Sequence, residues 1–509
     1  MNRRNGLFIA VALGALLALA LSMDAKAETP SPPSCGEGQK EAEAQRRKGA
    51  ESFPPLPLPA TPLRRTERKR PPAPPALIGK LEYGQIVWAT DSGGRRFSYR
   101  DWTTDPLDII NLMKLTNDAL DMRYRSVNTS FEEFSYKPDE LPILYLTGHE
   151  AVSLTEEQRS NLRWYLNDGG YLIADACCGS EPFWKSFLEE MRAIFPQRKL
   201  YQLQPDHPVF LSYYQIGDVV HIEDGQESAK RPPTLWGINI GCRTAIFLTT
   251  YDLSCGWDGH SHPTGNRIGV EDARRLGVNL LTYCLAHYKL GRFLSTQKRY
   301  YQETDHTRDQ FVFGQVLHDG DWDPTPNGIM ALLKHATTHT TMDVQFKREE
   351  VDLREAAALQ HPMLYMTGHH EINLSEAEIS GLRNYLRNGG ILVADSCCGR
   401  DAFDRSFREL VEKALPGLSL ERIPLNHPLY SARTRTATVE YSQRLRHLRP
   451  ELSRPKLEGI TLNGQLAVIY SPYGLGTCWD GQFRPYALCY ENEDALNLGL
   501  NILVYAMTH

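Results

Sequence analysis

Residues Leu144–Gly179 read LYLTGHEAVSLTEEQRSNLRWYLNDGGYLIADACCG, and residues Leu364–Gly399 read LYMTGHHEINLSEAEISGLRNYLRNGGILVADSCCG. Of the 36 aligned positions, 20 are identical, and the alignment needs no gap. The same chain therefore contains one unit twice. Two copies are too few for a solenoid, in which three or more repeats normally stack. The duplication instead predicts two globular domains with the same fold.

The repeated unit has the pattern of a strand, a helix and a second strand. Ile143–Leu146 is a short apolar run, and Tyr171–Ala174 is another. Between them, Thr155 and Gln158 have the spacing of a capping box, which predicts the start of a helix. The helix ends before Gly170, since glycine is favoured where a helix stops. A strand-helix-strand unit with short connections is normally parallel and right-handed.

The polar loops of the unit follow its two strands. In a parallel sheet, the loops TGH and DACCG would lie at the same edge, which is the edge where open α/β sheets bind ligands. Outside the unit, we expect first strands at Gln85–Ala89 and Phe311–Val316, and closing helices at Val270–His287 and Asp494–Met507. Alternating strands and helices predict two three-layer α/β domains with mostly parallel sheets, of the flavodoxin-like or amidotransferase-like type.

The N-terminal region differs in composition from the rest of the chain. Residues 1–27 combine an arginine pair, an apolar stretch and the sequence Ala25-Lys26-Ala27, which is typical of a secretory signal peptide. Residues 28–78 are rich in proline and charge, and we expect a disordered linker there. The first domain then covers residues 79–292 and the second covers residues 293–509. The prediction is an exported, periplasmic or extracellular protein with no membrane span after signal cleavage.

Composition limits the partners. The net charge of −6 and the even mixture of signs give no basic surface, so nucleic acid is excluded as a partner. We expect an unknown envelope ligand or protein as the partner, and neither a cofactor nor a metal.

The cysteines fall in a repeated pattern. A Cys-Cys pair follows the second strand of each unit, and a further cysteine precedes a Trp-Asp-Gly sequence. In an exported protein, this pattern favours a disulfide between Cys178 and Cys255 and another between Cys398 and Cys478. Cys242, Cys284 and Cys489 lack strict counterparts and are expected in the core.

Three other interpretations of the paired cysteines stay open. They are buried reduced thiols, metal ligands acting with His149 or His207, and a nucleophile. In the nucleophilic interpretation, Cys178 lies in a strand-to-helix turn, His149 is its base, and Asp175 orients the histidine or acts as a second acid. A Gly-x-Cys-x-Gly elbow, which would make this assignment specific, is absent from the sequence.

The candidate pocket residues all follow predicted strands or flank the paired cysteines. The set is Asp101, Trp102, Gly148, His149, Asp175, Cys177, Cys178, His207, Trp257 and Asp258 in the first copy, and Asp321, Trp322, His369, Asp395, Cys397, Cys398, His427, Trp479 and Asp480 in the second. Each type has a structural alternative: histidines before proline pack in turns, tryptophans cover cores, and aspartates cap helices.

Several motifs of the first copy resemble the bacterial domain of unknown function 4159. They are Asp101-Trp102 with Asp105-Pro106, Leu146-Thr147-Gly148-His149, Leu162-Arg163-x-Tyr165-Leu166, Gly169-Gly170, Asp175, Phe195-Pro196 and Asp206-His207-Pro208. The second copy departs at Thr325, Leu415 and Asn426. The resemblance implies a fold like that of class I glutamine amidotransferases and implies no particular activity.

Two functions follow as expectations. The first is non-enzymatic recognition of a ligand or protein at the cell envelope, through the C-terminal edges of both sheets. The alternative is a Cys/His-dependent or metal-dependent hydrolase that acts on amide or glycosidic bonds of envelope material.

Overall fold

The computed structural model describes residues 73–509 except 85, 91–92, 260–263 and 295–310. The signal peptide and nearly all of the linker predicted at 28–78 lie outside the described residues. Among the residues described, no helix combines the length and the apolar character needed to cross a membrane.

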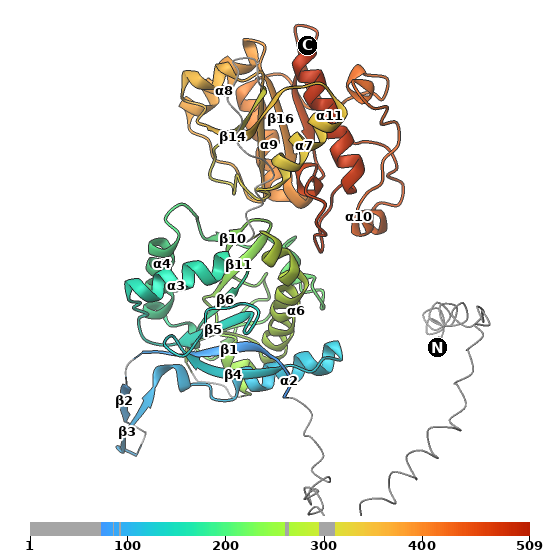
Figure 1. The fold of residues 1–509 in the computed structure, drawn as a ribbon. Coiled ribbons are helices and arrows are strands. Elements are labelled where there is room, and N and C mark those ends of the chain that lie inside the picture. The colour runs from blue at the N-terminus through green and yellow to red at the C-terminus, as the bar shows by residue number, and fades with distance from the viewer. Residues whose placement is uncertain (1–72, 85, 91–92, 260–263, 295–310) are drawn as a thin grey trace, which may run out of the picture. The chain divides into compact units, whose positions relative to one another are not determined.

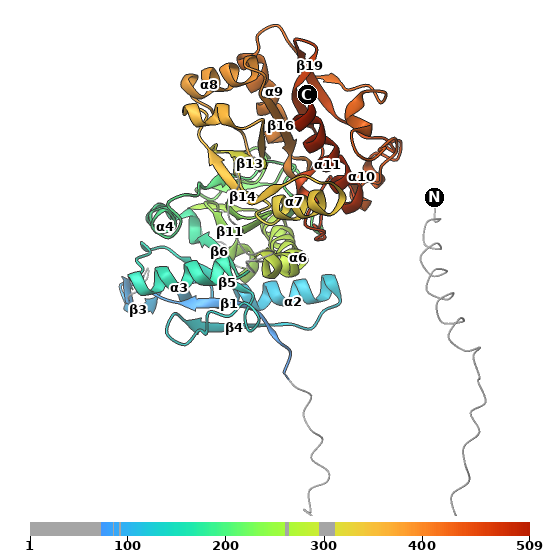
Figure 2. The same cartoon turned by 45° about the horizontal axis from the view of Figure 1, so that its top comes forward.

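The first domain is built on a seven-stranded sheet (Figures 1 and 2). Its strands, in spatial order, are β4 (Arg125–Ser130), β1 (Ala76–Glu82), β5 (Ile143–Gly148), β6 (Tyr171–Ala176), β11 (Arg243–Thr249), β10 (Leu235–Ile240) and β7 (Tyr201–Gln202). The first five of these strands run parallel, and β10 is antiparallel to both of its neighbours. This confirms the predicted mostly parallel sheet.

Helices cover both faces of this sheet. They are α2 (Asp108–Leu120), α3 (Glu156–Asn167), α4 (Glu181–Ile194), α5 (Ser254–Asp258) and α6 (Val270–Leu294). Side chains alternate along each central strand: Tyr145 packs with the α2 and α6 side of the core, and Leu144 packs with the α3 and α4 side. Because both faces are buried, the strands read as continuous apolar runs.

The second domain repeats the arrangement. Its sheet has the order β14 (Val344–Val351), β13 (Phe311–Val316), β15 (Met363–Gly368), β16 (Ile391–Ser396), β19 (Gln465–Ser471), β18 (Glu458–Leu462) and β17 (Glu421–Arg422). Its helices are α7 (Gly328–His339), α8 (Glu376–Arg387), α9 (Asp401–Ala414), α10 (Gln443–Leu448) and α11 (Asn492–Thr508). The chain thus has two three-layer α/β domains, as predicted.

Both copies contain the helix-start motif that the sequence predicts. Thr155 and Gln158 form the predicted capping box of α3, and Ser375 and Glu378 form that of α8. Gly169 takes a left-handed conformation with φ 105°, directly after α3, where a side chain would be strained.

The first strand of the first domain was predicted wrongly. Residues Ile86–Thr90 form β2, which pairs only with β3 (Arg96–Arg100) in a separate hairpin. The sheet instead begins with β1, which lies partly within the predicted linker. Lys80 interrupts the apolar run of this strand, so the sequence did not predict it. The lysine is nevertheless buried, and its Nζ lies 2.6 Å from Asp108 Oδ2. Three short strands, β8 (His221–Glu223), β9 (Gln226–Glu227) and β12 (Asn266–Ile268), form a small sheet of their own.

Candidate functional site: two thiol clusters

The loops after β5 and β6 lie side by side, as the parallel topology predicted. Thr147 pairs with Asp175 and Gly148 pairs with Ala176 in the parallel ladder. The ladder of β15 and β16 in the second domain has the same register. The histidine loop and the Cys-Cys loop therefore leave each sheet at the same edge.

The first cluster lies at this edge of the first domain. Its ligand atoms come from Cys177, Cys178, Asp252 and Cys255, and all four lie within 4.8 Å of one another. The backbone N–H of Cys178 donates to Asp252 Oδ2 at 2.7 Å, and the N–H of Cys255 donates to Oδ1 at 3.1 Å. Asp252, which the sequence analysis did not single out, thus fixes both cysteine-bearing turns.

Cys178 has an unusual backbone. It has φ 55° and ψ 16° in the turn between β6 and α4, and Cys398 has φ 56° at the same place in the second domain. A left-handed conformation costs a residue with a Cβ free energy, and such residues cluster at functional sites. Hydrogen bonding with Cys178 and Cys255, together with burial, raises the pKa of Cys177 well above its usual value.

His149 stands beside this cluster and is held by Asp101. The Asp101 carboxylate accepts from the backbone N–H groups of His149 and Glu150, each at 2.9 Å, and its Oδ1 lies 3.5 Å from His149 Nδ1. Burial lowers the pKa of His149, but hydrogen bonds with Asp101 and Cys178 outweigh burial and raise it to about 10. Gly148 permits this approach, since a Cβ there would collide with the Asp101 carboxylate.

The predicted role of Asp175 as the orienter of His149 is wrong. Asp175 is fully buried beneath the loops, where it accepts from the Tyr145 hydroxyl, the Thr249 hydroxyl and the backbone N–H of Ser254. It ties β6 to the turn that carries Cys255. Asp101 is the carboxylate that faces the histidine, because the loop before α2 folds back over the sheet edge.

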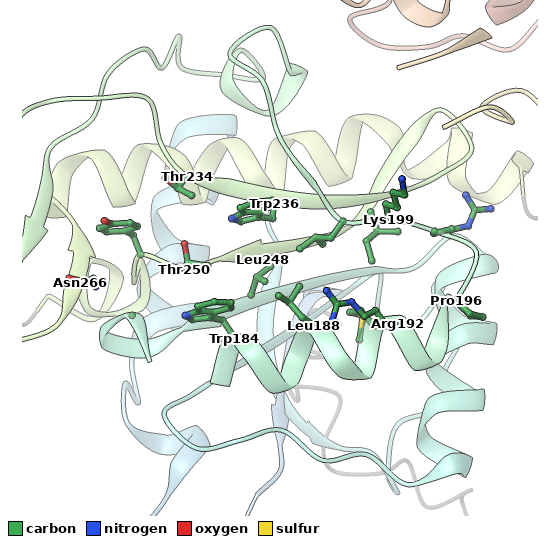
Figure 3. A pocket seen from close by; sticks show the side chains of 16 residues that line it. Trp184, Leu188, Arg192, Pro196, Lys199, Thr234, Trp236, Leu248, Thr250 and Asn266 are labelled. Carbon is green, nitrogen blue, oxygen red and sulfur yellow. The ribbon is translucent and has the colours of Figure 1, made fainter. Parts of the chain in front are cut away.

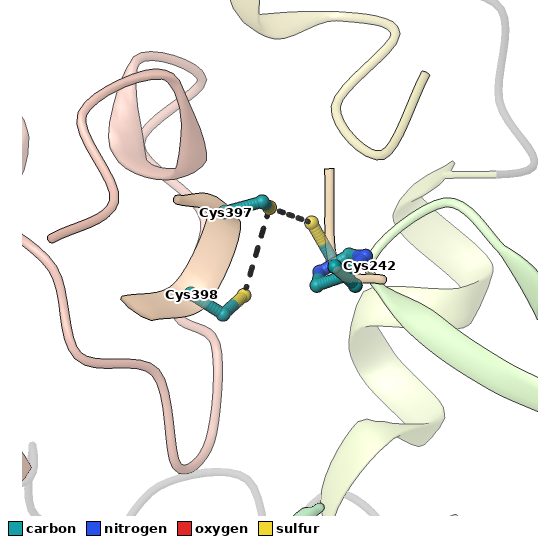
Figure 4. Close-up of side chains that lie close together, drawn as sticks. Cys242, Cys397 and Cys398 are labelled. Carbon is teal, nitrogen blue, oxygen red and sulfur yellow. Dashed lines mark hydrogen bonds between the residues drawn. The ribbon is translucent and has the colours of Figure 1, made fainter. Parts of the chain in front are cut away.

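The second cluster combines residues of both domains. Its ligand atoms belong to Cys242, His369, Cys397 and Cys398, and they too lie within 4.8 Å of one another. The Sγ atoms of Cys242 and Cys397 are 3.5 Å apart, and those of Cys397 and Cys398 are 3.8 Å apart (Figure 4). Cys242 is buried, as expected of a core residue. It also projects from the turn between β10 and β11 onto the second domain, a role that the sequence did not predict.

His369 in this cluster has a close carboxylate partner. Its Nδ1 lies 2.7 Å from Asp321 Oδ2, and its side chain is 6% exposed, against 28% for His149. The second cluster is therefore more enclosed than the first. Burial opposes protonation of His369, but Asp321 and Cys242 raise its pKa to about 9. Hydrogen bonds from Cys242 and Cys397 lower the pKa of Cys398 well below its usual value.

The third cysteines of the two copies are not equivalent. The N–H groups of Leu253 and Leu475 both donate to the buried aspartate of their own domain, so Cys255 corresponds to Thr477. Thr477 takes the place of the thiol: its hydroxyl accepts from the backbone N–H of Cys398 at 3.0 Å and donates to Cys397 Sγ at 3.4 Å. Cys478 is one residue later and points elsewhere.

The structure does not form the predicted disulfides. The nine cysteines that it describes carry thiols, and Cys478 faces Cys489, with 2.8 Å between their Sγ atoms, rather than Cys398. Cys178 and Cys255 do lie together, within the first cluster. Their proximity was predicted correctly, and a bond between them was not found.

Other candidate residues have structural partners outside both clusters. The His207 and His427 rings each accept from a backbone N–H two residues later, at 3.2 Å. Trp257 and Trp479 are buried and donate to helix carbonyls. Three of the candidate aspartates bind other groups: Asp258 accepts from the Leu107 N–H, Asp395 accepts from the Leu475 N–H, and Asp480 accepts from the Arg484 guanidinium. The Arg348 guanidinium lies over the Trp322 ring, and Trp102 is partly buried.

A cavity of about 930 Å³ adjoins the first domain's edge (Figure 3). It lies between α4 and strands β10 and β11, and its walls include Trp184, Leu188 and Trp236. Gly179 and Asn266 line it, so it reaches the loop that carries the paired cysteines. The sequence did not predict this cavity, because part of its wall comes from β10, a strand that was not predicted.

The fold and the clusters define a class: a protein of two α/β domains with thiol-rich sites at the C-terminal edges of their sheets. A comparison with family profiles then places the chain. It belongs to the family described as Domain of unknown function (DUF4159), whose profile matches residues 78–285 and 312–507. The two matches confirm the two tandem copies. A comparison with curated proteins gives no match.

Proposed function

We propose that this protein binds thiophilic metal ions, Zn²⁺ or Cu⁺, with one ion at each thiol cluster. One observation carries the proposal: each cluster gathers three thiols and one oxygen or nitrogen ligand within 4.8 Å, although the third thiol has a different origin in each. Cys255 supplies it in the first domain. In the second, where Thr477 stands in its place, Cys242 supplies it.

The spacing suits a tetrahedral ion. Zinc binds thiolates at about 2.3 Å and imidazole or carboxylate at about 2.0–2.2 Å, so its ligand atoms lie roughly 3.3–3.8 Å apart. The sulfur separations of 3.5–4.0 Å within the clusters are close to this. Soft thiolate ligands favour zinc and cuprous ions over magnesium or calcium. A bound cation also removes the cost of crowding three thiolates.

This proposal is a specific form of the ligand recognition expected at these sheet edges. Its proposed place is the cell envelope, and that part rests on the leader predicted at residues 1–27.

The test is equilibrium dialysis of the metal-free protein against Zn²⁺, with elemental analysis of the bound metal. We expect two ions per chain in the wild type and one in Cys255→Ser. Cys284→Ala, which removes a buried thiol outside both clusters, is the matched control and should keep two. Cobalt in place of zinc should show thiolate charge-transfer absorption. Binding that is weak in the wild type, or equal in wild type and Cys255→Ser, would contradict the proposal.

A second candidate function is thiol-dependent hydrolysis in the first domain. It is favoured by the left-handed Cys178 in a strand-to-helix turn beside a histidine that a carboxylate holds. The nucleophile would attack an amide carbonyl, and Asp101 replaces Asp175 as the orienter. Iodoacetamide separates the two functions. A metal ligand at Cys178 is protected by Zn²⁺, whereas a nucleophile reacts rapidly in the protein as isolated and slows in His149→Ala.

A further inference from the structure

The turn that carries Cys242 belongs to one domain and completes the cluster of the other. Cys242 lies between β10 and β11 of the first domain, and its Sγ is 3.5 Å from Cys397 Sγ in the second. His369, Cys397 and Cys398 all belong to the second domain. Without Cys242, that domain offers two thiols and one imidazole.

The equivalent turn of the second domain shows what this position ordinarily holds. Ile240 pairs with Arg243 across a two-residue turn, and Leu462 pairs with Gln465 in the same way. The second domain fills its turn with Asn463-Gly464, both left-handed, which is the commonest hairpin sequence. The first domain instead has Gly241-Cys242. Only Gly241 of these two is left-handed, with φ 63°, which is the pattern of a type II′ turn, the other common two-residue hairpin turn. The turn thus stays two residues long while it presents a thiol.

The contacts around Cys242 hold the two domains against each other. The Asn239 amide lies 3.0 Å from His370 Nε2 and 3.2 Å from Asp321 Oδ2. Tyr201 stacks on the His370 ring with 3.7 Å between the ring centroids. Cys242 itself is 8% exposed. The thiol is therefore buried between the domains, where it packs beside Leu290 and lies 3.1 Å from the Pro324 carbonyl oxygen.

The carboxylate behind His369 completes the arrangement. Metal-bound histidines usually donate their second ring N–H to a carboxylate, which fixes the ring and its tautomer. Asp321 Oδ2, 2.7 Å from His369 Nδ1, is placed for that role and leaves Nε2 for the ion.

We infer that the second ion is an interdomain clasp, held by Cys242 of the first domain and by His369, Cys397 and Cys398 of the second. This inference rests on the proposed metal binding and adds that the ion joins the domains. The first ion, bound by residues of one domain alone, has no such effect.

Hydrogen-deuterium exchange of the full chain, read by mass spectrometry with and without Zn²⁺, tests the clasp. In the wild type, Zn²⁺ should slow exchange in peptides covering residues 235–249 and 396–399. In Cys242→Ser, the first of these peptides should no longer respond, while the peptide covering residues 177–179 still does. Zinc affinity at the second site should fall by at least the roughly 10–100-fold that outer contacts of metal sites are worth. Cys284→Ala is again the control.

The outcomes separate the two ideas. If no peptide responds to Zn²⁺ and no zinc is bound, the proposed function fails. If the wild type binds two ions and Cys242→Ser binds two with unchanged affinity, metal binding stands and the clasp is overturned. Circular dichroism that matches the wild type shows that Cys242→Ser is folded. Should that variant not fold, Cys397→Ser replaces it, with loss of zinc protection in residues 235–249 as the required result.

Discussion

Nδ1 of His369 lies 2.7 Å from Oδ2 of Asp321, whereas the equivalent pair of the first domain, His149 and Asp101, is 3.5 Å apart. The shorter contact holds the His369 ring more closely than Asp101 holds the His149 ring, which lies at a more exposed edge. The same histidine-aspartate pair thus has two environments. The pair in the second domain is enclosed and adjoins a cluster built from both domains, whereas the pair in the first domain is more exposed to solvent.

The tight pair predicts an effect of Asp321→Asn. Asp321 has φ 65°, which asparagine tolerates well, so the substitution removes the charge and keeps the backbone. Zinc affinity at the second site should fall about 10-fold or more, since outer-shell carboxylates are worth roughly 10–100-fold. Competition with a chromophoric chelator measures it. Asp319→Asn, in the same loop, is the control, and equal affinities in the two variants would refute the role of Asp321.

A side chain at position 148 should destabilise the first domain through a steric clash. An added methyl group would meet the Asp101 carboxylate, whose two bonds to the His149 and Glu150 N–H groups shape the histidine loop. We expect Gly148→Ala to lower the free energy of unfolding by about 1–3 kcal/mol, as overpacking does. Urea unfolding followed by tryptophan fluorescence measures it. Gly217→Ala is the matched control, because nothing lies within 4 Å of the Cβ it would add.

Much of the fold was predictable because its signals are local. The capping boxes at Thr155 and Ser375 and the apolar runs before them depend on residues a few positions apart. The parallel pairing of β5 with β6 follows from the helical crossover between them, and it predicts the TGH and CCG loops at one edge of the sheet. Strand β1 was not predicted, since the partners of its buried Lys80, the Asp108 carboxylate and the Asp105 carbonyl, lie far along the chain.

The candidate site was predictable only in part. The repeated cysteine pattern predicts Cys478 as the partner of Cys398, but the 222-residue offset between Trp257 and Trp479 aligns Cys255 with Thr477. One position matters here, because each residue of a helical turn rotates the side chain by about 100°. Cys242 carried no local signal at all. Its partners belong to the other domain, and no periodicity reports a contact between domains.

We expect a disulfide between Cys478 and Cys489, in place of the one that the sequence predicts between Cys398 and Cys478. Their Sγ atoms are 2.8 Å apart, and both side chains are buried beside α11. Oxidised glutathione, which takes up the two electrons and two protons, should join them while the metal-loaded clusters stay reduced. Non-reducing peptide mass spectrometry identifies the linkage. A linkage of Cys398 to Cys478 would contradict the geometry, and Cys489→Ala should abolish the bond without changing zinc stoichiometry.

His287 predicts that acid destabilises the protein. Its ring is buried in α6 and donates to the Tyr283 carbonyl at 3.0 Å. Burial, with the charges of Arg400 and Arg243, lowers its pKa to about 3, against an ordinary value of about 6.5. The unfolded state therefore binds the proton more readily than the folded state. The stability that the neutral ring contributes is complete above pH 6.5 and is lost as the pH falls toward 3.

Proton linkage sets the size of this loss of stability and suggests a control variant. His287 should lower the free energy of unfolding by up to about 1.4 kcal/mol for each pH unit below 6.5. Urea unfolding of the chelator-treated protein at several pH values measures the slope, since metal release in acid would otherwise add to it. His287→Gln removes the titrating ring, so its slope over this range should be shallower than that of the wild type. Parallel slopes in the two proteins would show that His287 is already protonated in the folded state, which its burial beside two arginines argues against.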